Sequence, residues 1–234
     1  MKDLRSDISN IWRTAARLSG PGSARAVMFI AAQSGEGVTS IASSFSLIAS
    51  KRARRMAWLV DLDLRNNSAF KGFQSGFAKG VARPGRAYDA SLGMPPIYTV
   101  TPKTVARSGE LAKTEKLLTV HQIENERLMV SRFRNDRLRP AQRVHVQTQP
   151  VWWEKLRSAA DWIIVDAPAI DRSGAGLAVA GQMDGVILVV RADKTSAADV
   201  TALRREVEVH GGNVIGVAMN AVRSDARLAD RMSG

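Results

Sequence analysis

The feature that most constrains the fold is the segment at residues 26–40, AVMFIAAQSGEGVTS, where an apolar run leads into a glycine-rich loop. A strand followed by G-x-x-x-x-G-K-[ST] is typical of a phosphate-binding loop (P-loop), whose backbone N–H groups cradle phosphates and whose hydroxyl holds Mg²⁺. Gly35 and Gly37 keep the cradle and Thr39 keeps the hydroxyl, but Val38 stands where the lysine is expected and Ala32 replaces the first glycine. The segment predicts a nucleotide-binding scaffold without its usual cation.

Two further apolar runs end in carboxylates. MAWLVDLD at residues 56–63 ends in Asp61 and Asp63, and WIIVD at residues 162–166 ends in Asp166. Continuous apolar runs are typical of strands covered on both faces by helices. Since ligands bind beyond the carboxyl ends of such strands, these acids and the P-loop are predicted to meet in one crevice that holds Mg²⁺ and a nucleotide. Helix capping by Asp166 and solvated turn positions for the other two acids remain open as plainer interpretations.

The order of the predicted elements indicates the fold class. Further strands are expected at 97–100, 128–131, 186–190 and 214–220, and helices at 2–18, 107–120, 151–160 and 197–209, with loop or short helix at 66–95. Alternation of this kind predicts a single α/β domain, a doubly wound and mostly parallel sheet with helices on both faces. Residues 1–22 are expected to form an N-terminal helix for oligomerisation or docking, ahead of a P-loop domain at 23–234.

Charge and hydropathy restrict the partners. The chain of 234 residues carries a net charge of +12, which attracts nucleic acid, anionic lipid or acidic protein. No apolar run approaches the roughly 20 residues needed to span a bilayer, so a cytoplasmic protein is expected. The basic run at 51–55 is explained by the end of a helix, whose dipole favours cations. For the arginine-rich region 127–143, a membrane or acidic partner and a merely solvated face both remain open.

Three motifs resemble the bacterial exopolysaccharide and capsule tyrosine kinases, called BY-kinases, within the ParA/MinD group of deviant P-loop ATPases. They are SGEGVTS at 34–40, LVDLDLR at 59–65 and IIVDAPA at 163–169. The resemblance covers roughly half of the chain. It implies an ATP-linked cytoplasmic component of a polysaccharide assembly and export machine, peripheral at the inner membrane and acting with a membrane-embedded copolymerase that regulates chain length.

The resemblance also implies roles for individual residues. Mg²⁺ would be ordered by Thr39, Asp61 and Asp166, and Asp63 would be the base that activates a tyrosine hydroxyl. Asn220 matches an adenine-facing asparagine, with a strand-end turn residue as the open alternative. The phosphates of ATP or ADP would be held by Ser34, Gly35, Glu36, Gly37, Val38, Thr39 and Ser40.

The sequence also departs from the family pattern at positions that matter for catalysis. Val38 replaces the lysine, Ala169 replaces the second proline of D-x-P-P, and Tyr88 and Tyr98 are the only tyrosines, so the C-terminal tyrosine cluster is missing. Efficient phosphoryl transfer would then need a substitute cation, for which Arg65 or an arginine of a neighbouring subunit is the hypothesis. The prediction is a regulatory pseudokinase.

Two other functions remain open at this stage. One is an active tyrosine kinase that acts in trans on another protein. The other is a positioning ATPase of the ParA/MinD kind on DNA or lipid, although Gln33 replaces the signature lysine of those proteins and nucleic acid is not the expected partner. A ring of subunits is a further hypothesis, because the ring-forming helix motif is present only in part, through Asn10, Arg13 and Ala16.

Overall fold

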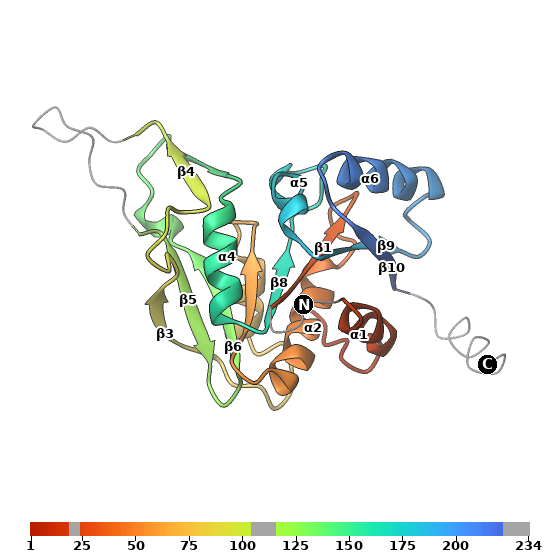
Figure 1. The fold of residues 1–234 in the computed structure, drawn as a ribbon, viewed down its shortest axis with the longest axis horizontal. Coiled ribbons are helices and arrows are strands. Elements are labelled where there is room, and N and C mark those ends of the chain that lie inside the picture. Colours follow the sequence, from red (N-terminus) through yellow and green to blue (C-terminus); the bar gives the residue numbers. More distant parts are fainter. Residues whose placement is uncertain (19–23, 104–115, 222–234) are drawn as a thin grey trace, which may run out of the picture.

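The computed structural model describes residues 1–18, 24–103 and 116–221. Its centre is an eight-stranded sheet in the order β10-β9-β1-β8-β2-β6-β5-β3 (Figure 1). The strands of this sheet are β1 Arg25–Ala31, β2 Ala57–Asp61, β3 Pro84–Asp89, β5 Leu118–Ile123, β6 Leu128–Phe133, β8 Trp162–Asp166, β9 Gly185–Arg191 and β10 Val214–Asn220. β4 Tyr98–Thr101 and β7 Arg143–Val146 form a separate antiparallel pair.

The helices complete an α/β architecture. The six strands from β10 to β6 run parallel, whereas β5 and β3 add antiparallel strands at one edge. The predicted doubly wound, mostly parallel sheet is therefore confirmed. The helices are α1 Ser9–Ala16, α2 Val38–Arg52, α3 Ser68–Gln74, α4 Pro150–Ala159, α5 Ala175–Val179 and α6 Ala197–Val209, with short 3₁₀ turns η1 Asn135–Arg137 and η2 Ala180–Gln182.

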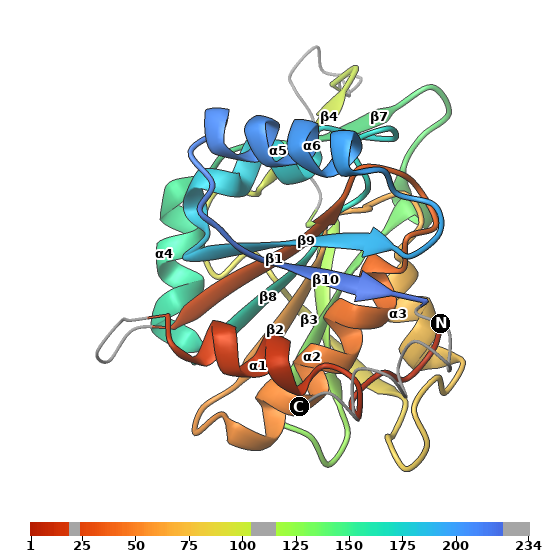
Figure 2. The same ribbon diagram turned by 90° about the vertical axis from the view of Figure 1, so that its right-hand side faces the viewer.

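Both faces of the sheet are covered, which explains the continuous apolar strands. In β1 the side chains of Met28 and Ile30 join the core beneath α4, α5 and α6, whereas Val27 and Phe29 join the core beneath α1, α2 and α3. Figure 2 shows α5 and α6 on one side of the sheet and α1, α2 and α3 on the other. A strand buried on both sides has no position for a solvated residue, so only its ends carry charge.

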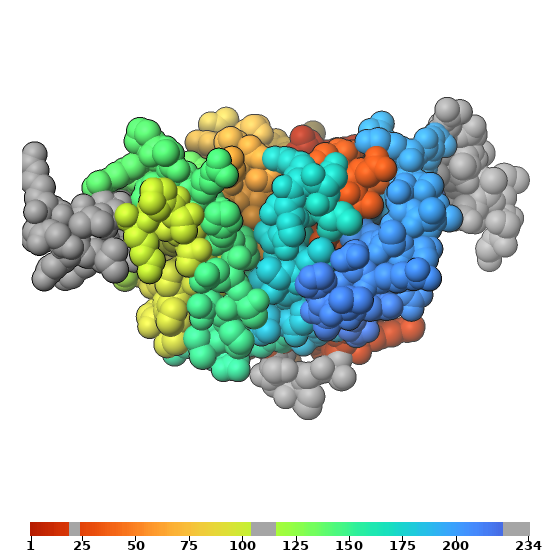
Figure 3. Space-filling view, turned by 90° about the horizontal axis from the view of Figure 1, so that it is seen from above, coloured from red at the N-terminus to blue at the C-terminus, as the bar shows by residue number. Residues whose placement is uncertain are grey.

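The carboxyl ends of the parallel strands bring the predicted site together. Asp61 ends β2 and lies beside Asp166, which ends the neighbouring β8. β1 leads directly into the P-loop, and α2 begins at Val38. Figure 3 looks down on this end of the molecule, where orange atoms of the P-loop region lie beside the cyan segment that follows β8.

Several predicted elements need correction. The helix expected at 2–18 is shorter, because Leu4 donates its backbone N–H to the Ser44 hydroxyl and the chain turns before α1 begins at Ser9. The helix expected at 107–120 is wrong at its end, where Leu118 begins strand β5; residues 104–115 lie outside the described residues. β3, β7 and α5 were not predicted. The loop or short helix expected at 66–95 contains α3 but also β3.

Two local features of the packing are clear from the contacts. Trp152 and Trp153 of α4 are each 1% exposed, so they pack in the core. In the basic run at 51–55, Arg55 pairs with Asp161 at 2.7 Å, and Arg52 lies over the ring of Trp12 at 4.7 Å. The charges of Arg52 and Arg55 are therefore used within the fold.

Candidate nucleotide site

The P-loop has the backbone shape that phosphate binding requires. Gly35 and Gly37 have φ values of 85° and 96°, a region that L-residues with side chains rarely adopt. A Cβ atom on Gly37 would lie 2.0 Å from Nδ2 of Asn220, so only glycine fits there. The loop borders a cavity of about 170 Å³ that is also lined by Asp63, Asp166 and Arg172.

The loop is braced from outside by the end of β10 and by the loop that follows β9. Asn220 donates from Nδ2 to the carbonyl of Glu36 at 2.8 Å. The buried carboxylate of Glu36 accepts the Gln33 N–H at 3.2 Å and also the hydroxyl of Thr195. These contacts fix the shape of the loop without any ligand. They give Asn220 a role in holding the P-loop, whereas its adenine contact stays a prediction.

A second carboxylate holds the start of the loop. Asp171 accepts both the backbone N–H and the hydroxyl of Ser34 at 2.9 Å each. These hydrogen bonds, first that of the Ser34 N–H, lower the pKa of Asp171. Lys194 donates to the Ser34 carbonyl at 3.4 Å. The sequence analysis did not identify Asp171 or Lys194, because neither residue lies in the three motifs at 34–40, 59–65 and 163–169.

Asp166 and Asp61 form a buried acidic pair beneath the cavity. Burial, reinforced by the neighbouring Asp61 carboxylate, raises the pKa of Asp166 well above its usual range, while the Thr39 hydroxyl bonds to it. Burial also raises the pKa of Asp61 to about 7, against the opposing effect of backbone N–H donors. Two carboxylates that share a buried site repel each other, and a bound cation would relieve that repulsion.

The two acids that end β2 have different surroundings. Asp61 accepts the N–H groups of Asp63 and Ala69 at 2.9 Å each and therefore shapes the turn into α3. Asp63 lines the cavity, where it accepts from Asn66 at 2.8 Å and pairs with Arg172 at 3.5 Å. Asp63 is thus the acid of this pair that faces the cavity.

The cation that faces the cavity differs from the predicted one. Among the described residues, Arg172 is the only lysine or arginine that lines it. Arg65 instead lines a neighbouring groove, and Val38 is only 8% exposed and packs with the core beneath α2. Arg172 lies six residues beyond Asp166, outside the D-x-P-P motif, so only its place on the loop after β8 could have indicated it.

The residues present fit Mg²⁺ and a nucleotide. Mg²⁺ commonly takes one or two carboxylates or hydroxyls and completes its shell with waters and substrate phosphates. Thr39 and Asp166 supply such a pair beside the backbone cradle of the loop. Within the described residues no three histidine or acidic side chains form a metal site by themselves, so phosphate oxygens would be needed to complete the shell.

Comparison with solved structures places the fold. The VpsO kinase domain matches with a TM-score of 0.54 and 17% identity over 94% of this chain and 96% of that one. The BceF tyrosine kinase domain matches with a TM-score of 0.57 and 13% identity over 94% and 76%. The chain has a BY-kinase-like P-loop fold. No protein-family model matches the sequence, and no curated protein matches it.

Nucleotide binding is seen among other proteins of this fold. Cobyrinic acid a,c-diamide synthase of Mycobacterium smegmatis, solved with ADP and magnesium, matches with a TM-score of 0.51 and 14% identity over 90% of this chain and 81% of that one. Identities this low establish the shared BY-kinase-like fold alone. No helix among the described residues is long and apolar enough to cross a membrane.

Proposed function

We propose that this chain is a BY-kinase-like regulatory component of an exopolysaccharide synthesis and export machine, which binds a nucleotide but transfers its phosphoryl group poorly. The observation that carries the proposal is an intact phosphate cradle and Thr39–Asp166 pair around a cavity whose lysine position is occupied by the buried Val38. Its fold, shared with kinase domains such as that of VpsO, supports the kinase-like part.

The loss of the lysine affects binding and catalysis differently. Losing one charge-assisted contact to phosphate removes roughly 1.5–3 kcal/mol of binding, or about one to two decades in affinity. Phosphoryl transfer depends more strongly on such contacts, because it consists mainly of positioning and stabilisation of charge on the transferring group. The loss of the lysine is therefore expected to weaken nucleotide binding less than it slows phosphoryl transfer.

The surroundings of the candidate base point the same way. Asp63 accepts two hydrogen bonds from Asn66 and pairs with Arg172, so its lone pairs are already engaged. A tyrosine hydroxyl would have to displace these contacts before Asp63 could take its proton. A site whose base is occupied and whose lysine is missing suits a nucleotide-dependent switch better than a fast kinase.

A partner at the membrane completes the proposal. The basic chain has a net charge of +12, and the resemblance of its motifs to those of BY-kinases implies a membrane-embedded copolymerase as the partner. We place this chain in the cytoplasm, peripheral at the inner membrane through such a partner. An active kinase acting in trans is the second candidate, because Arg172 lines the cavity and could take over part of the role of the lysine.

Calorimetric titration with ADP in the presence and absence of Mg²⁺ tests the nucleotide site. We expect micromolar, Mg²⁺-dependent binding by the wild type, reduced about 100-fold or more in Asp166→Ala. Glu154→Gln, which changes an exposed carboxylate on α4, is the matched control and should bind as the wild type does. If neither the wild type nor Val38→Lys binds ADP, the P-loop is only a structural turn and the nucleotide part of the proposal fails.

A further inference from the structure

A second and larger hollow adjoins the phosphate cavity. It has a volume of about 720 Å³ and lies between the loop after β2, the strand β7 and the loop after β8. It shares Asp63, Pro168 and Arg172 with the phosphate cavity. We call it the basic groove, because its other charged lining residues are Arg65 and Arg143.

The charges of the basic groove are not balanced by the fold. Arg172 pairs with Asp63, which is the one carboxylate among the described residues of the lining. Within the described part of the chain, the guanidinium groups of Arg65 and Arg143 have neither an ion pair nor a hydrogen bond, and both residues are exposed. The groove therefore presents two unpaired cations toward solvent.

Arg143 differs from most of the other arginines in the arginine-rich region 127–143. Arg127 donates to the carbonyl of Ala53 at 2.9 Å, and Arg134 pairs with Asp136 at 3.2 Å. Arg132 lies over the ring of Phe70 at 5.0 Å. Internal contacts thus account for these three arginines. Among the described residues the side chains of the exposed Arg139 and Arg143 have no such contact, and of these two only Arg143 lines the basic groove.

The shape of the lining favours one class of anion. Arg65 and Arg143 line a hollow of about 720 Å³, which the plane of headgroups of a membrane surface would not fill. A DNA duplex needs a broad basic face for its rows of phosphates. An extended peptide is narrow enough to enter the groove, and its carboxylates can be spaced to meet the arginines as bidentate pairs.

We propose that the basic groove binds an acidic peptide segment of a partner protein. The proposal stands independently of nucleotide binding, since Arg65 and Arg143 take no part in the phosphate cavity. A segment bound there would end beside Asp63 and Arg172, the wall shared with the phosphate cavity. Binding of the partner segment would therefore be coupled to the charge of the phosphate cavity through these two shared residues.

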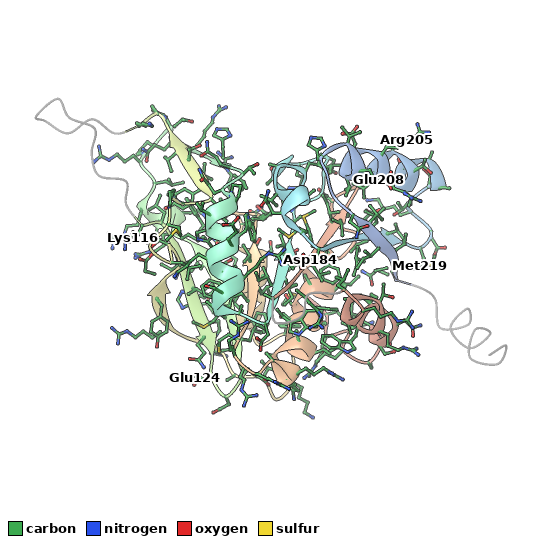
Figure 4. All side chains as sticks on the ribbon, viewed as in Figure 1. Lys116, Glu124, Asp184, Arg205, Glu208 and Met219 are labelled. Carbon is green, nitrogen blue, oxygen red and sulfur yellow. The ribbon has the colours of Figure 1, made fainter. Side chains whose placement is uncertain are left out.

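Fluorescence anisotropy with a labelled hexaglutamate peptide tests the proposal. At low salt we expect binding that weakens about tenfold or more in Arg65→Glu/Arg143→Glu. The matched control is Arg86→Glu/Arg205→Glu, which makes the same charge change on exposed residues of β3 and α6 and should weaken binding much less. Arg205 lies on α6, as labelled in Figure 4.

The remaining outcomes each decide the proposal. Equal weakening in both double variants would mean a general charge effect and would overturn it. Tighter binding of a DNA duplex or of phosphatidylserine vesicles, lost in the groove variant alone, would also overturn it. Arg65→Gln/Arg143→Gln, checked for folding by circular dichroism, should also bind the peptide more weakly than the wild type, but by a smaller factor than Arg65→Glu/Arg143→Glu. Peptide binding by protein that does not bind ADP would support the groove while contradicting the proposed nucleotide site.

Discussion

In the parallel half of the molecule, formed by β1, β2, β8, β9 and β10, most strand residues are apolar and buried between two layers of helices. In the extension, which we define as the described residues 84–103 and 116–146 and which includes the parallel strand β6, polar side chains such as Thr119, His121 and Ser131 are buried among the apolar ones. The first region is held by non-directional burial, and the second also needs specific hydrogen bonds. Substitutions should therefore act differently in the two regions.

The largest losses of stability are expected from truncating one buried phenylalanine in each of the two regions. Phe29→Ala in β1 and Phe133→Ala in β6 each remove a fully buried ring and should each lower the free energy of unfolding by about 3–5 kcal/mol. Chemical denaturation followed by tryptophan fluorescence and by circular dichroism measures both. Coincident transitions for both variants are expected, because β6 pairs directly with β2. A separate early transition in Phe133→Ala alone would show that the extension unfolds independently.

A buried asparagine links the two regions and should give the next largest effect. Asn67 has a positive φ of 51°, donates to the Phe133 carbonyl at 3.0 Å and accepts the Phe133 N–H at 2.6 Å. Asn67→Ala loses both hydrogen bonds and should lower the free energy of unfolding by roughly 2–4 kcal/mol. Asn67→Gly is the control, because it tolerates the backbone angle while losing the bonds. An alanine variant as stable as the wild type would contradict this link.

The adjacent tryptophans of α4 offer a smaller, paired comparison. Trp152 donates from Nε1 to the carbonyl of Ala90 at 3.0 Å, whereas Nε1 of Trp153 is buried without a partner among the described residues. Trp152→Phe should therefore cost about 1–2 kcal/mol more than Trp153→Phe in thermal or chemical unfolding. The opposite order would mean that ring packing, and not the hydrogen bond to the extension, decides the stability here.

The smallest expected effect is a pH dependence in the extension. Burial lowers the pKa of His121 below its usual value of 6.5, because the imidazolium is disfavoured beside Phe70 and is repelled by Arg132 and Arg134. A lowered pKa gives stability that is present above pH 6.5 and is lost as the pH falls toward the folded-state pKa. His121→Gln should flatten the loss of stability between about pH 7 and 5, measured by urea unfolding. A slope as steep in His121→Gln as in the wild type would contradict this assignment.

The sequence predicted the parallel half well for a physical reason. α6, β8 and β10 were predicted with the bounds that the structure shows, and β1, β2 and β9 within one residue at each end. Their apolar runs are unambiguous, because burial on both faces excludes polar residues. The carboxylates at the ends of β2 and β8 were likewise predicted to converge, and Asp63 and Asp166 do line one cavity.

The extension could not be predicted in the same way. Residues 118–123, LTVHQI, mix polar and apolar residues without a clear period, and the helix expected there is a strand that pairs with β3 and β6. Pairing with partners distant in sequence overrode the local pattern. Arg172 and Asp171 were missed for a related reason, since their place beside the P-loop depends on how the loop after β8 folds back.

The rate of ATP hydrolysis by Val38→Lys tests the central claim most directly. Val38 borders the phosphate cavity, so a lysine there can extend its ammonium toward the phosphates while its stem stays packed. In single-turnover assays with Mg²⁺, we predict hydrolysis at least about tenfold faster than by the wild type, with no gain in the control Val38→Met. Equal rates for the wild type and Val38→Lys, in protein shown to bind ATP, would contradict the account that the missing lysine limits catalysis.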